Sequence, residues 1–166
     1  MDRMTKEQRS KCMGMIVRKA LYKEGFRYLC QPTKVGGKKM PGHPDIVLPK
    51  YRTIIEVRGC FWHRHEGCRL ATMPATNVEF WTKKFADNVA RDKRHEDEWA
   101  ALGWRVFVVW ECALKGGTCK NALQLLTLFV RKFPDWVRCE IGNLNDCGVI
   151  VHAHSTMGGG MKGGEL

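Results

Sequence analysis

The thirteen residues 56–68 constrain the fold of this chain more than any other stretch. Three of their side chains can bind one soft divalent ion once both thiols ionise: Cys60, His65 and Cys68. Sites built from nitrogen and sulfur donors in a tetrahedron favour zinc. Gaps this short require a tight loop, which holds Phe61 and Trp62 near the surface. The stretch therefore predicts a zinc loop that presents two large aromatic side chains to a partner.

The net charge indicates what kind of partner that is. The chain has 166 residues (19.0 kDa), enough for one domain with its own core. Its 28 Lys and Arg residues outnumber 17 Asp and Glu residues, for a net charge of +11 and a pI of about 9.5. This excess favours a polyanion such as nucleic acid, although a protein can also simply be basic. No basic amphipathic helix points to a membrane surface.

The eight cysteines are irregularly spaced in a chain whose first residues are charged and carry no apolar signal segment. No apolar run reaches the ~18 residues of a transmembrane helix. We therefore expect reduced thiols, some of them on a metal, and a cytoplasmic location.

Two β-branched segments, Asp45–Leu48 and Thr53–Val57, are joined by a short turn and predict an antiparallel hairpin. Asp45 begins the first arm and Glu56 ends the second, so pairing brings the two carboxylates together. Two carboxylates at one strand end suit Mg²⁺, a hard ion that takes oxygen ligands from carboxylates and phosphates together. The alternative is that both acids are simply solvated. Two neighbours favour the magnesium site: Arg58 can hold a phosphate oxygen, and His63 can activate a water molecule.

Helical patterns flank the hairpin. Thr5–Gln8 has the form of a capping box, and a helix, or two shorter ones divided at Gly14, is expected to run to Glu24. A long helix is expected over Val78–Leu102, with Asn77 as its N-cap, and an amphipathic one over Asn121–Lys132.

The long helix carries further candidate side chains. Trp81, in its first turn, is either a core residue or a third exposed aromatic. One polar face is either solvated or reaches DNA: Asn88, Arg91, Asp92 and His95. The apolar run Trp104–Trp110 predicts a central strand. It ends at Cys112, which can supply the fourth metal donor.

Other segments carry weaker patterns. Phe26–Cys30 predicts a strand, and Pro32–His43 predicts a flexible basic loop that follows a phosphate backbone or is simply solvated. Beyond Pro134 no pattern is evident, and the Gly-rich end is expected to be disordered. We therefore divide the chain into a domain of residues 1–134 and an extension of residues 135–166.

Five groups of residues occur in one order between Arg9 and Phe133: Pro44-Asp45; Gly59-Cys60-Phe61-Trp62-His63; Pro74-Ala75-Thr76 with Glu79-Phe80-Trp81; Asn88 with Arg91-Asp92; and Gly103-Trp104-Arg105-Val106 with Trp110-Glu111-Cys112-Ala113-Leu114. These residues resemble the very-short-patch mismatch repair endonucleases, a bacterial branch of the restriction-endonuclease-like fold. The resemblance implies a three-layer α/β structure, with a central mixed β-sheet flanked by helices and a structural zinc loop. It implies an enzyme that nicks one strand of duplex DNA beside a T·G mismatch, using Mg²⁺.

Residue roles follow from the resemblance by position. Asp45 is expected to bind Mg²⁺, and His63 to be the general base. The zinc ligands are expected to be Cys60, His65, Cys68 and Cys112. The side chains expected to enter the base stack are Phe61, Trp62 and Trp81 from the major groove and Met13 from the other side. Such insertion is favoured at a mispaired step, because that step costs less free energy to unstack than a paired one. A nucleoid-associated monomer that works with other mismatch repair proteins is expected.

The chain also departs from this family. Glu56 stands where the family usually has an apolar residue, and Arg58 where it has a histidine. Glu56-Val57-Arg58 instead resembles the acid-x-lysine arm of the wider restriction-enzyme superfamily, so Glu56 is expected to bind Mg²⁺ and Arg58 to stabilise charge on the phosphate. Gly14 falls where the family has a glutamate near the metal, and the C-terminal tail matches nothing in it. The alternative hypothesis is therefore a DNA-binding module that keeps the zinc loop but has lost its active site.

Overall fold

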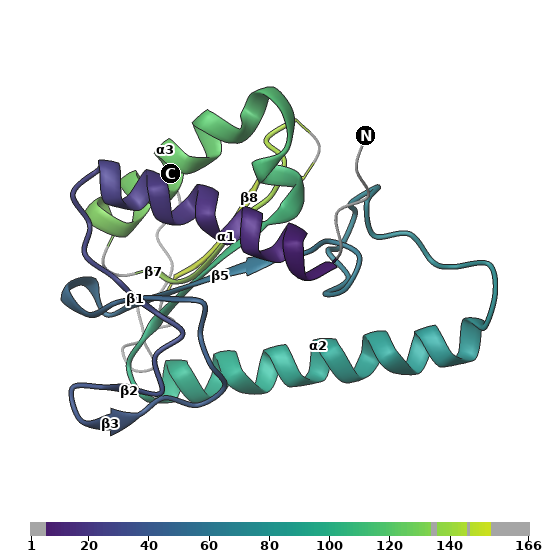
Figure 1. Cartoon of the computed structure of the whole chain (residues 1–166), viewed down its shortest axis with the longest axis horizontal. Helices are drawn as coiled ribbons and strands as arrows, with labels where there is room; N and C mark the ends of the chain where they lie inside the picture. Colours follow the sequence, from purple (N-terminus) through teal and green to yellow (C-terminus); the bar gives the residue numbers. More distant parts are fainter. Residues whose placement is uncertain (1–5, 134–135, 146, 154–166) are drawn as a thin grey trace, which may run out of the picture.

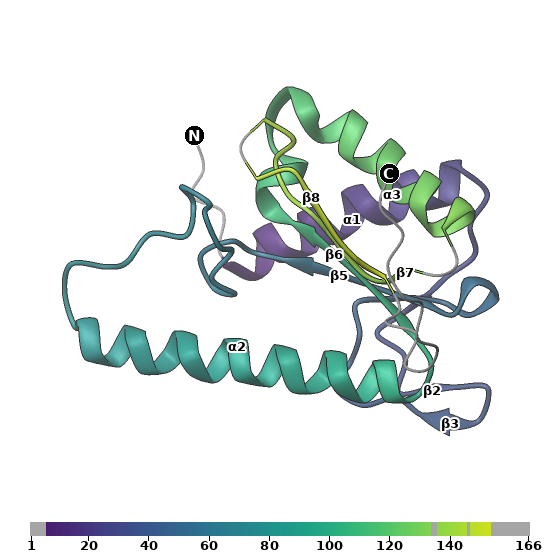
Figure 2. The same ribbon diagram turned by 180° about the vertical axis from the view of Figure 1, so that it is seen from behind.

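The computed structural model describes residues 6–133, 136–145 and 147–153, which form three layers with a β-sheet in the middle (Figures 1 and 2). The sheet has the order β1-β4-β5-β6-β7-β8. Its strands are β1 (Leu29–Cys30), β4 (Ile46–Leu48), β5 (Thr53–Arg58), β6 (Arg105–Trp110), β7 (Trp136–Ile141) and β8 (Val149–Ala153). The β5–β6 and β6–β7 pairs are parallel, and the other pairs are antiparallel. This confirms the predicted α/β class with a mixed central sheet flanked by helices, whereas the restriction-endonuclease-like assignment stays a prediction.

Helices cover both faces of the sheet. One face carries α1 (Lys6–Lys23) and α3 (Cys119–Lys132), and the other carries α2 (Val78–Ala101) (Figure 1). Short 3-10 helices follow β4 and β6: η1 (Pro49–Tyr51), η2 (Glu111–Leu114) and η3 (Gly116–Thr118). Helix α1 continues through Gly14, so the alternative of two shorter helices is wrong. The expected cap at Thr5 lies outside the described residues.

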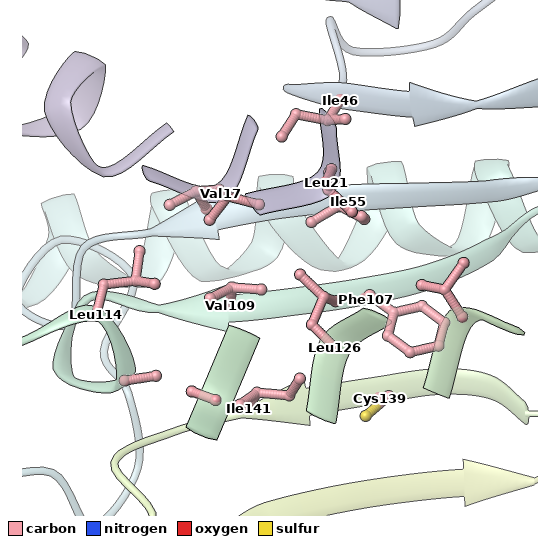
Figure 3. Close-up of a cluster of buried hydrophobic side chains, with 14 of the residues drawn as sticks. Val17, Leu21, Ile46, Ile55, Phe107, Val109, Leu114, Leu126, Cys139 and Ile141 are labelled. Carbon is pink, nitrogen blue, oxygen red and sulfur yellow. The ribbon is translucent and has the colours of Figure 1, made fainter. Parts of the chain in front are cut away.

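The larger core lies between the sheet and the α1–α3 layer (Figure 3). Val17 and Leu21 from α1 and Leu126 from α3 are buried against Ile55 and Phe107, each at most 1% exposed. Because side chains alternate across a strand, the neighbours of these strand residues face α2. There Trp99 packs over Ile54, Val106 and Val108. All of β6 is buried on both faces, which confirms the predicted central strand.

Three local predictions need correction. The strand expected over Phe26–Cys30 is only Leu29–Cys30, because Phe26 is buried beside the end of α1, where its N–H donates to the carbonyl of Leu21 (2.9 Å). The basic loop contains a small hairpin, β2 (Lys34–Val35) with β3 (Lys38–Lys39). Helix α2 does begin after Asn77, but that residue is left-handed (φ 53°) and its side chain makes no capping hydrogen bond.

The segment beyond Pro134 has more structure than the sequence indicates. Strands β7 and β8 form an antiparallel pair that extends the central sheet past β6. These two strands were not predicted from the sequence, and the division into domains at residue 134 stays a prediction. The Gly-rich end lies outside the described residues. Within the described part of the chain, no helix combines the length and apolar character needed to cross a membrane.

Candidate active site and metal centre

Asp45 and Glu56 meet at one end of the β4–β5 hairpin. Ile46 pairs with Ile55, so the residue before β4 lies opposite Glu56. One hydrogen bond joins the two acids, from the N–H of Asp45 to Glu56 Oε1 (2.9 Å). A second ties Asp45 to the neighbouring strand, from the N–H of Val57 to Asp45 Oδ2 (2.9 Å). The hairpin thus brings the two side chains together, as the sequence pattern predicts. We call them the carboxylate pair.

Burial makes the carboxylate pair difficult to ionise. Burial, followed by the charge of Asp45, raises the pKa of Glu56 to about 8. Burial also raises the pKa of Asp45, although the N–H of Val57 and the charges of His63 and Arg58 oppose the shift. Two neighbouring carboxylates ionise together more readily when a cation neutralises their negative charges. Carboxylate oxygens are the hard ligands that Mg²⁺ prefers, so the pair fits this ion.

The raised pKa of Glu56 has a consequence for stability. The unfolded chain releases this proton near pH 4.5 and the metal-free fold near pH 8, so the folded state binds more protons between these values. The free energy of unfolding therefore falls as the pH rises through this window. At pH 6, Mg²⁺ must displace the proton of Glu56 before it binds the ionised pair, whereas near pH 8 much of that proton is already released. We therefore expect Mg²⁺ to raise the melting temperature more at pH 8 than at pH 6, as measured by scanning fluorimetry against EDTA.

Two variants control this experiment. Glu56→Gln removes the titrating group and is expected to abolish the difference between the two pH values. The matched change Glu79→Gln, at an exposed acid in the first turn of α2, should preserve it. An equal Mg²⁺ effect at both pH values in the unsubstituted protein would contradict the prediction.

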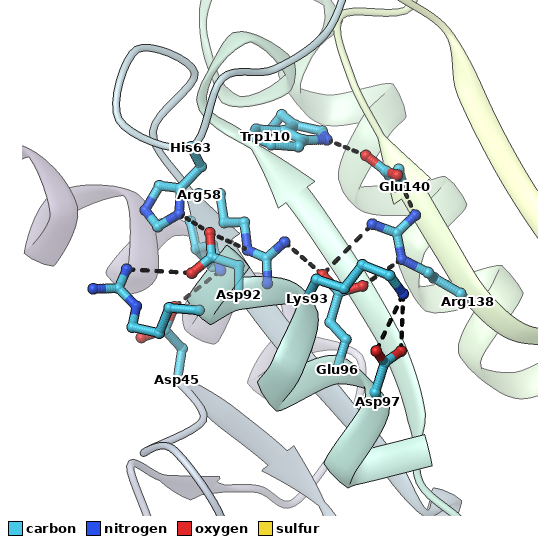
Figure 4. A network of polar contacts seen from close by, with 12 residues as sticks. Asp45, Arg58, His63, Asp92, Lys93, Glu96, Asp97, Trp110, Arg138 and Glu140 are labelled. Carbon is cyan, nitrogen blue, oxygen red and sulfur yellow. Dashed lines mark hydrogen bonds and ion pairs between the residues drawn. The ribbon is translucent and has the colours of Figure 1, made fainter. Parts of the chain in front are cut away.

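An imidazole and a third carboxylate lie beside the carboxylate pair (Figure 4). His63 follows β5 in a loop, and its Nδ1 hydrogen-bonds with Oδ2 of Asp92 on α2. Burial tends to raise the pKa of Asp92, but the hydrogen bond with His63 and the charge of Arg58 bring it below its ordinary value. Asp92 therefore stays ionised and orients the imidazole, which leaves Nε2 available for proton transfer.

Arg58 is a buried cation at the end of β5, only 5% exposed. Its Nη1 donates to Glu96 Oε1 on α2 (2.6 Å), and Glu96 also accepts from Nε of Arg138 on β7 (2.6 Å). Arg58 Nε lies 4.0 Å from Asp92 Oδ2 and has no hydrogen-bond partner among the described residues. A buried N–H without a partner is costly, and an anionic oxygen can satisfy it.

These groups share one small pocket of about 240 Å³, lined by the carboxylate pair, Arg58, His63 and Asp92. A larger cavity of about 730 Å³ opens toward β7 and shares the last three of these residues. It lacks both members of the carboxylate pair. The smaller pocket is therefore the candidate active site.

A second set of donors lies where the loop after β5 meets the end of β6. One ligand atom from each of four residues lies within 4.8 Å of the others: Cys60, His65, Cys68 and Cys112. Nδ1 of His65 is 3.5 Å from Cys60 Sγ and 3.4 Å from Cys112 Sγ. A hydrogen bond with Cys60 lowers the pKa of Cys112 to about 4, which favours a thiolate there. Three sulfurs and one imidazole are the donor set of a closed structural zinc site, so this Cys/His cluster fits zinc.

Residues beyond position 134 support the Cys/His cluster. The ring of His65 stacks on Trp110, with centroids 4.1 Å apart and planes 5° apart. Nε1 of Trp110 donates to Glu140 Oε2 on β7 (2.8 Å). The N–H of Asn143, in the turn after β7, donates to Cys112 Sγ (3.2 Å). Such outer hydrogen bonds orient metal ligands and tune their basicity.

Aromatic side chains gather between the loop after β5 and the start of α2. Ring centroids lie 5.1 to 5.8 Å apart among them, and we call the group the aromatic cluster: Phe61, Trp62, Phe80, Trp81 and Phe85. Trp81 belongs to this cluster and not to either hydrophobic core of the sheet. Phe85 is 3% exposed and Phe80 61% exposed, so the cluster has a buried base and an open edge. Sequence reasoning missed Phe85, which the spacing of four residues from Trp81 on a helix would have indicated.

Three other candidates for DNA contact lie in different surroundings. Asn88 is buried, and its Nδ2 donates to the carbonyl of Trp62 (3.1 Å), so it supports the aromatic cluster in the free protein. Arg91 is exposed and donates to Asp92 Oδ1 (3.2 Å). Met13 packs against the α1–α3 core. The expected contacts of these residues with DNA stay predictions.

Comparison with known proteins decides the family. A sequence model described as DNA mismatch endonuclease Vsr matches residues 1–69. The type II nicking enzyme V.NmeAIP of Neisseria meningitidis is 40% identical over 124 residues, which cover 74% of this chain and 82% of that enzyme. The chain belongs to the Vsr family. A Vsr-like relative, the type II nicking enzyme V.XorIIP of Xanthomonas oryzae, is 40% identical over 123 residues (68% and 86% covered). DNA mismatch endonuclease Vsr of Escherichia coli is 49% identical over 83 residues (50% and 53% covered).

Membership of the Vsr family makes the chain an endodeoxyribonuclease, with DNA as its partner. The segment that matches the Vsr sequence model contains most of the site: Asp45, Glu56, Arg58, Cys60, His63, His65 and Cys68. Asp92 and Cys112 lie outside that match, and the fold places each beside it. Sequence reasoning placed Asp92 on a polar helix face and in the Arg91-Asp92 group, but it gave Asp92 no role at the site, because its partner His63 is 29 residues away.

Proposed function

We propose that this chain is a Mg²⁺-dependent endonuclease that nicks one strand of duplex DNA beside a T·G mismatch. One observation carries the proposal: the carboxylate pair, Arg58, and His63 with Asp92 line one pocket of about 240 Å³. The aromatic cluster on the same loop and helix supports it. The monomeric state, the repair-protein partners and the nucleoid location stay predictions.

Each group around the pocket has a distinct task in phosphodiester hydrolysis. When bound at the carboxylate pair, Mg²⁺ supplies a Lewis acid for the phosphate. Arg58 offers its buried Nε–H to a phosphate oxygen. His63 accepts a proton from the attacking water through Nε2, while Asp92 holds Nδ1 and stabilises the imidazolium that forms. The water oxygen bonds to phosphorus as one ester bond breaks, which leaves a nick.

The aromatic cluster supplies the proposed recognition of the mismatch. Its exposed edge is apolar and rigid, because the rings pack against one another and Asn88 donates a hydrogen bond to the carbonyl of Trp62. Insertion of such rings into a base stack is cheapest at a mispaired step, which is already weakened. The Cys/His cluster, as a zinc site, would fix the loop that carries Phe61 and Trp62 to the end of β6.

The decisive experiment is a nicking assay on a labelled duplex with one T·G pair. A fully paired duplex of the same sequence is the control, and both are incubated with Mg²⁺ and with EDTA. A break that requires both the mismatch and Mg²⁺ is expected. Tighter binding to the mismatched duplex without a break would instead support a recognition module that has lost its chemistry.

Removal of one ring should separate recognition from cutting. Trp62→Ala is expected to reduce the preference for mismatched over paired duplex by roughly 5- to 150-fold, the equivalent of ~1–3 kcal/mol for one stacked base. The ratio of the two dissociation constants, from fluorescence anisotropy, measures this. Tyr22→Ala removes an exposed ring (64%) on α1 and should leave the ratio unchanged. An unchanged ratio in Trp62→Ala would exclude this ring from recognition.

A further inference from the structure

We propose that Cys147 is a reserve ligand of the Cys/His cluster, which replaces Cys68 as the fourth metal donor when that thiol is lost. The inference rests on the proposed metal centre and adds a fifth donor to it. Cys147 lies in the turn between β7 and β8, beyond both the segment that matches the Vsr sequence model and the residues that resemble the family. No role in the proposed reaction involves it.

Backbone hydrogen bonds fix the position of this turn. The N–H groups of Cys147 and Gly148 both donate to the carbonyl of Asn143, at 2.8 and 2.9 Å. Gly142 donates to the carbonyl of Gly148 (2.9 Å) and closes the turn. Asn143 in turn donates its N–H to Cys112 Sγ (3.2 Å). The turn is therefore attached directly to one of the four donors.

The turn also approaches the Cys/His cluster closely. A Cβ at Gly142 would lie 2.7 Å from Cβ of Cys147 and 3.0 Å from Cε1 of His65, so a side chain at this position would force the turn away. Cys147 packs, together with Cys68, against the buried cluster that contains Cys60 and Cys112. A fifth sulfur thus lies next to a complete set of four donors.

Cys68 is the ligand that Cys147 is best placed to replace. Cys60 and Cys112 are buried, whereas Cys68 and Cys147 are both partly exposed. A cavity of about 460 Å³ is lined by Cys68, Cys112 and Asn143. Asn143 accepts the hydrogen bond from the N–H of Cys147, so this open space borders the turn that carries Cys147. Where the Cys68 thiol is lost, the sulfur of Cys147 would supply the third thiolate, and its proton would pass to solvent. The donor set stays three thiolates and one imidazole, which zinc accepts equally well.

Cobalt binding to the full-length protein tests the exchange, because thiolate–Co²⁺ absorption reports how many sulfurs bind the metal. The unsubstituted protein, Cys68→Ser and Cys147→Ser are each expected to bind one Co²⁺ with the spectrum of three thiolates. Cys68→Ser/Cys147→Ser should lose at least about 10- to 100-fold in affinity. The matched control Cys68→Ser/Cys119→Ser removes a partly exposed thiol that packs against the other core, and should behave like Cys68→Ser alone.

Alkylation followed by mass spectrometry identifies the sulfur that binds. The metal should protect Cys147 in Cys68→Ser but leave it reactive in the unsubstituted protein. If the unsubstituted protein binds no metal, the proposed metal centre itself is wrong. If it binds metal but Cys68→Ser binds none, or binds it with Cys147 still reactive, the metal centre stands and the reserve ligand is refuted.

Discussion

Asp45→Asn is expected to abolish nicking of the T·G duplex, with a loss on the order of 10³-fold in single-turnover rate. The change removes one negative charge from the carboxylate pair, and a neutral amide is a much weaker ligand for Mg²⁺. The amide oxygen can still accept the hydrogen bond from the N–H of Val57, so the hairpin should keep its shape. Binding to the mismatched duplex should remain largely intact, as measured by anisotropy.

A matched surface change controls this result. Asp87→Asn alters an exposed acid whose partner is Lys83 one helical turn away (3.1 Å), an ion pair that contributes little. It should cut at nearly the rate of the unsubstituted protein. Cutting by Asp45→Asn at a comparable rate would exclude Asp45 from the reaction.

Cys60→Ser is expected to release the metal from the Cys/His cluster and lower the melting temperature by roughly 10 °C or more, at ~2–4 °C per kcal/mol for a chain of this size. The effect is large because the free energy of metal binding, ~10 kcal/mol or more in structural zinc sites, is also folding free energy. Cys60 is fully buried, so its thiol can be replaced only by a group that reaches the same closed site. Metal content by mass spectrometry and calorimetry measure the two effects.

Cys139→Ser provides the control for burial alone. Cys139 is also 0% exposed, but it lies in the core between the sheet and the α1–α3 layer. The same change there buries a hydroxyl group, at a cost of ~1–3 kcal/mol, and removes no metal donor. If the two variants melt alike and both retain the metal, the Cys/His cluster does not stabilise the fold.

The elements that sequence reasoning predicted are those with a local signal. The β4–β5 hairpin has β-branched arms on a short turn, so the meeting of Asp45 and Glu56 follows from antiparallel pairing. Strand β6 is an uninterrupted apolar run, as a strand buried on both faces must be. The place of Cys112 follows from the end of that strand.

Contacts between distant segments could not be predicted in this way. Asp92 looks like one more polar residue on an exposed helix face, and only the packing of α2 against the loop after β5 pairs it with His63. In β7, buried Cys139 and Ile141 alternate with Arg138 and Glu140, a pattern that is typical of a half-buried strand and that sequence reasoning missed. In the fold, Arg138 donates to Glu96 on α2, and Glu140 accepts a hydrogen bond from Trp110 on β6. Both partners lie far away in the sequence, so these contacts could not be predicted.

Helix α2 carries parts of both proposed activities on one straight element (Figure 2). Trp81 of the aromatic cluster and Asp92 of the candidate active site are eleven residues apart, roughly 16 Å at 1.5 Å of rise per residue. A helix keeps such a spacing far better than a loop. In the proposed enzyme, α2 therefore fixes the distance between the disturbed base pair and the bond that is cut. That distance does not depend on the sequence of the duplex.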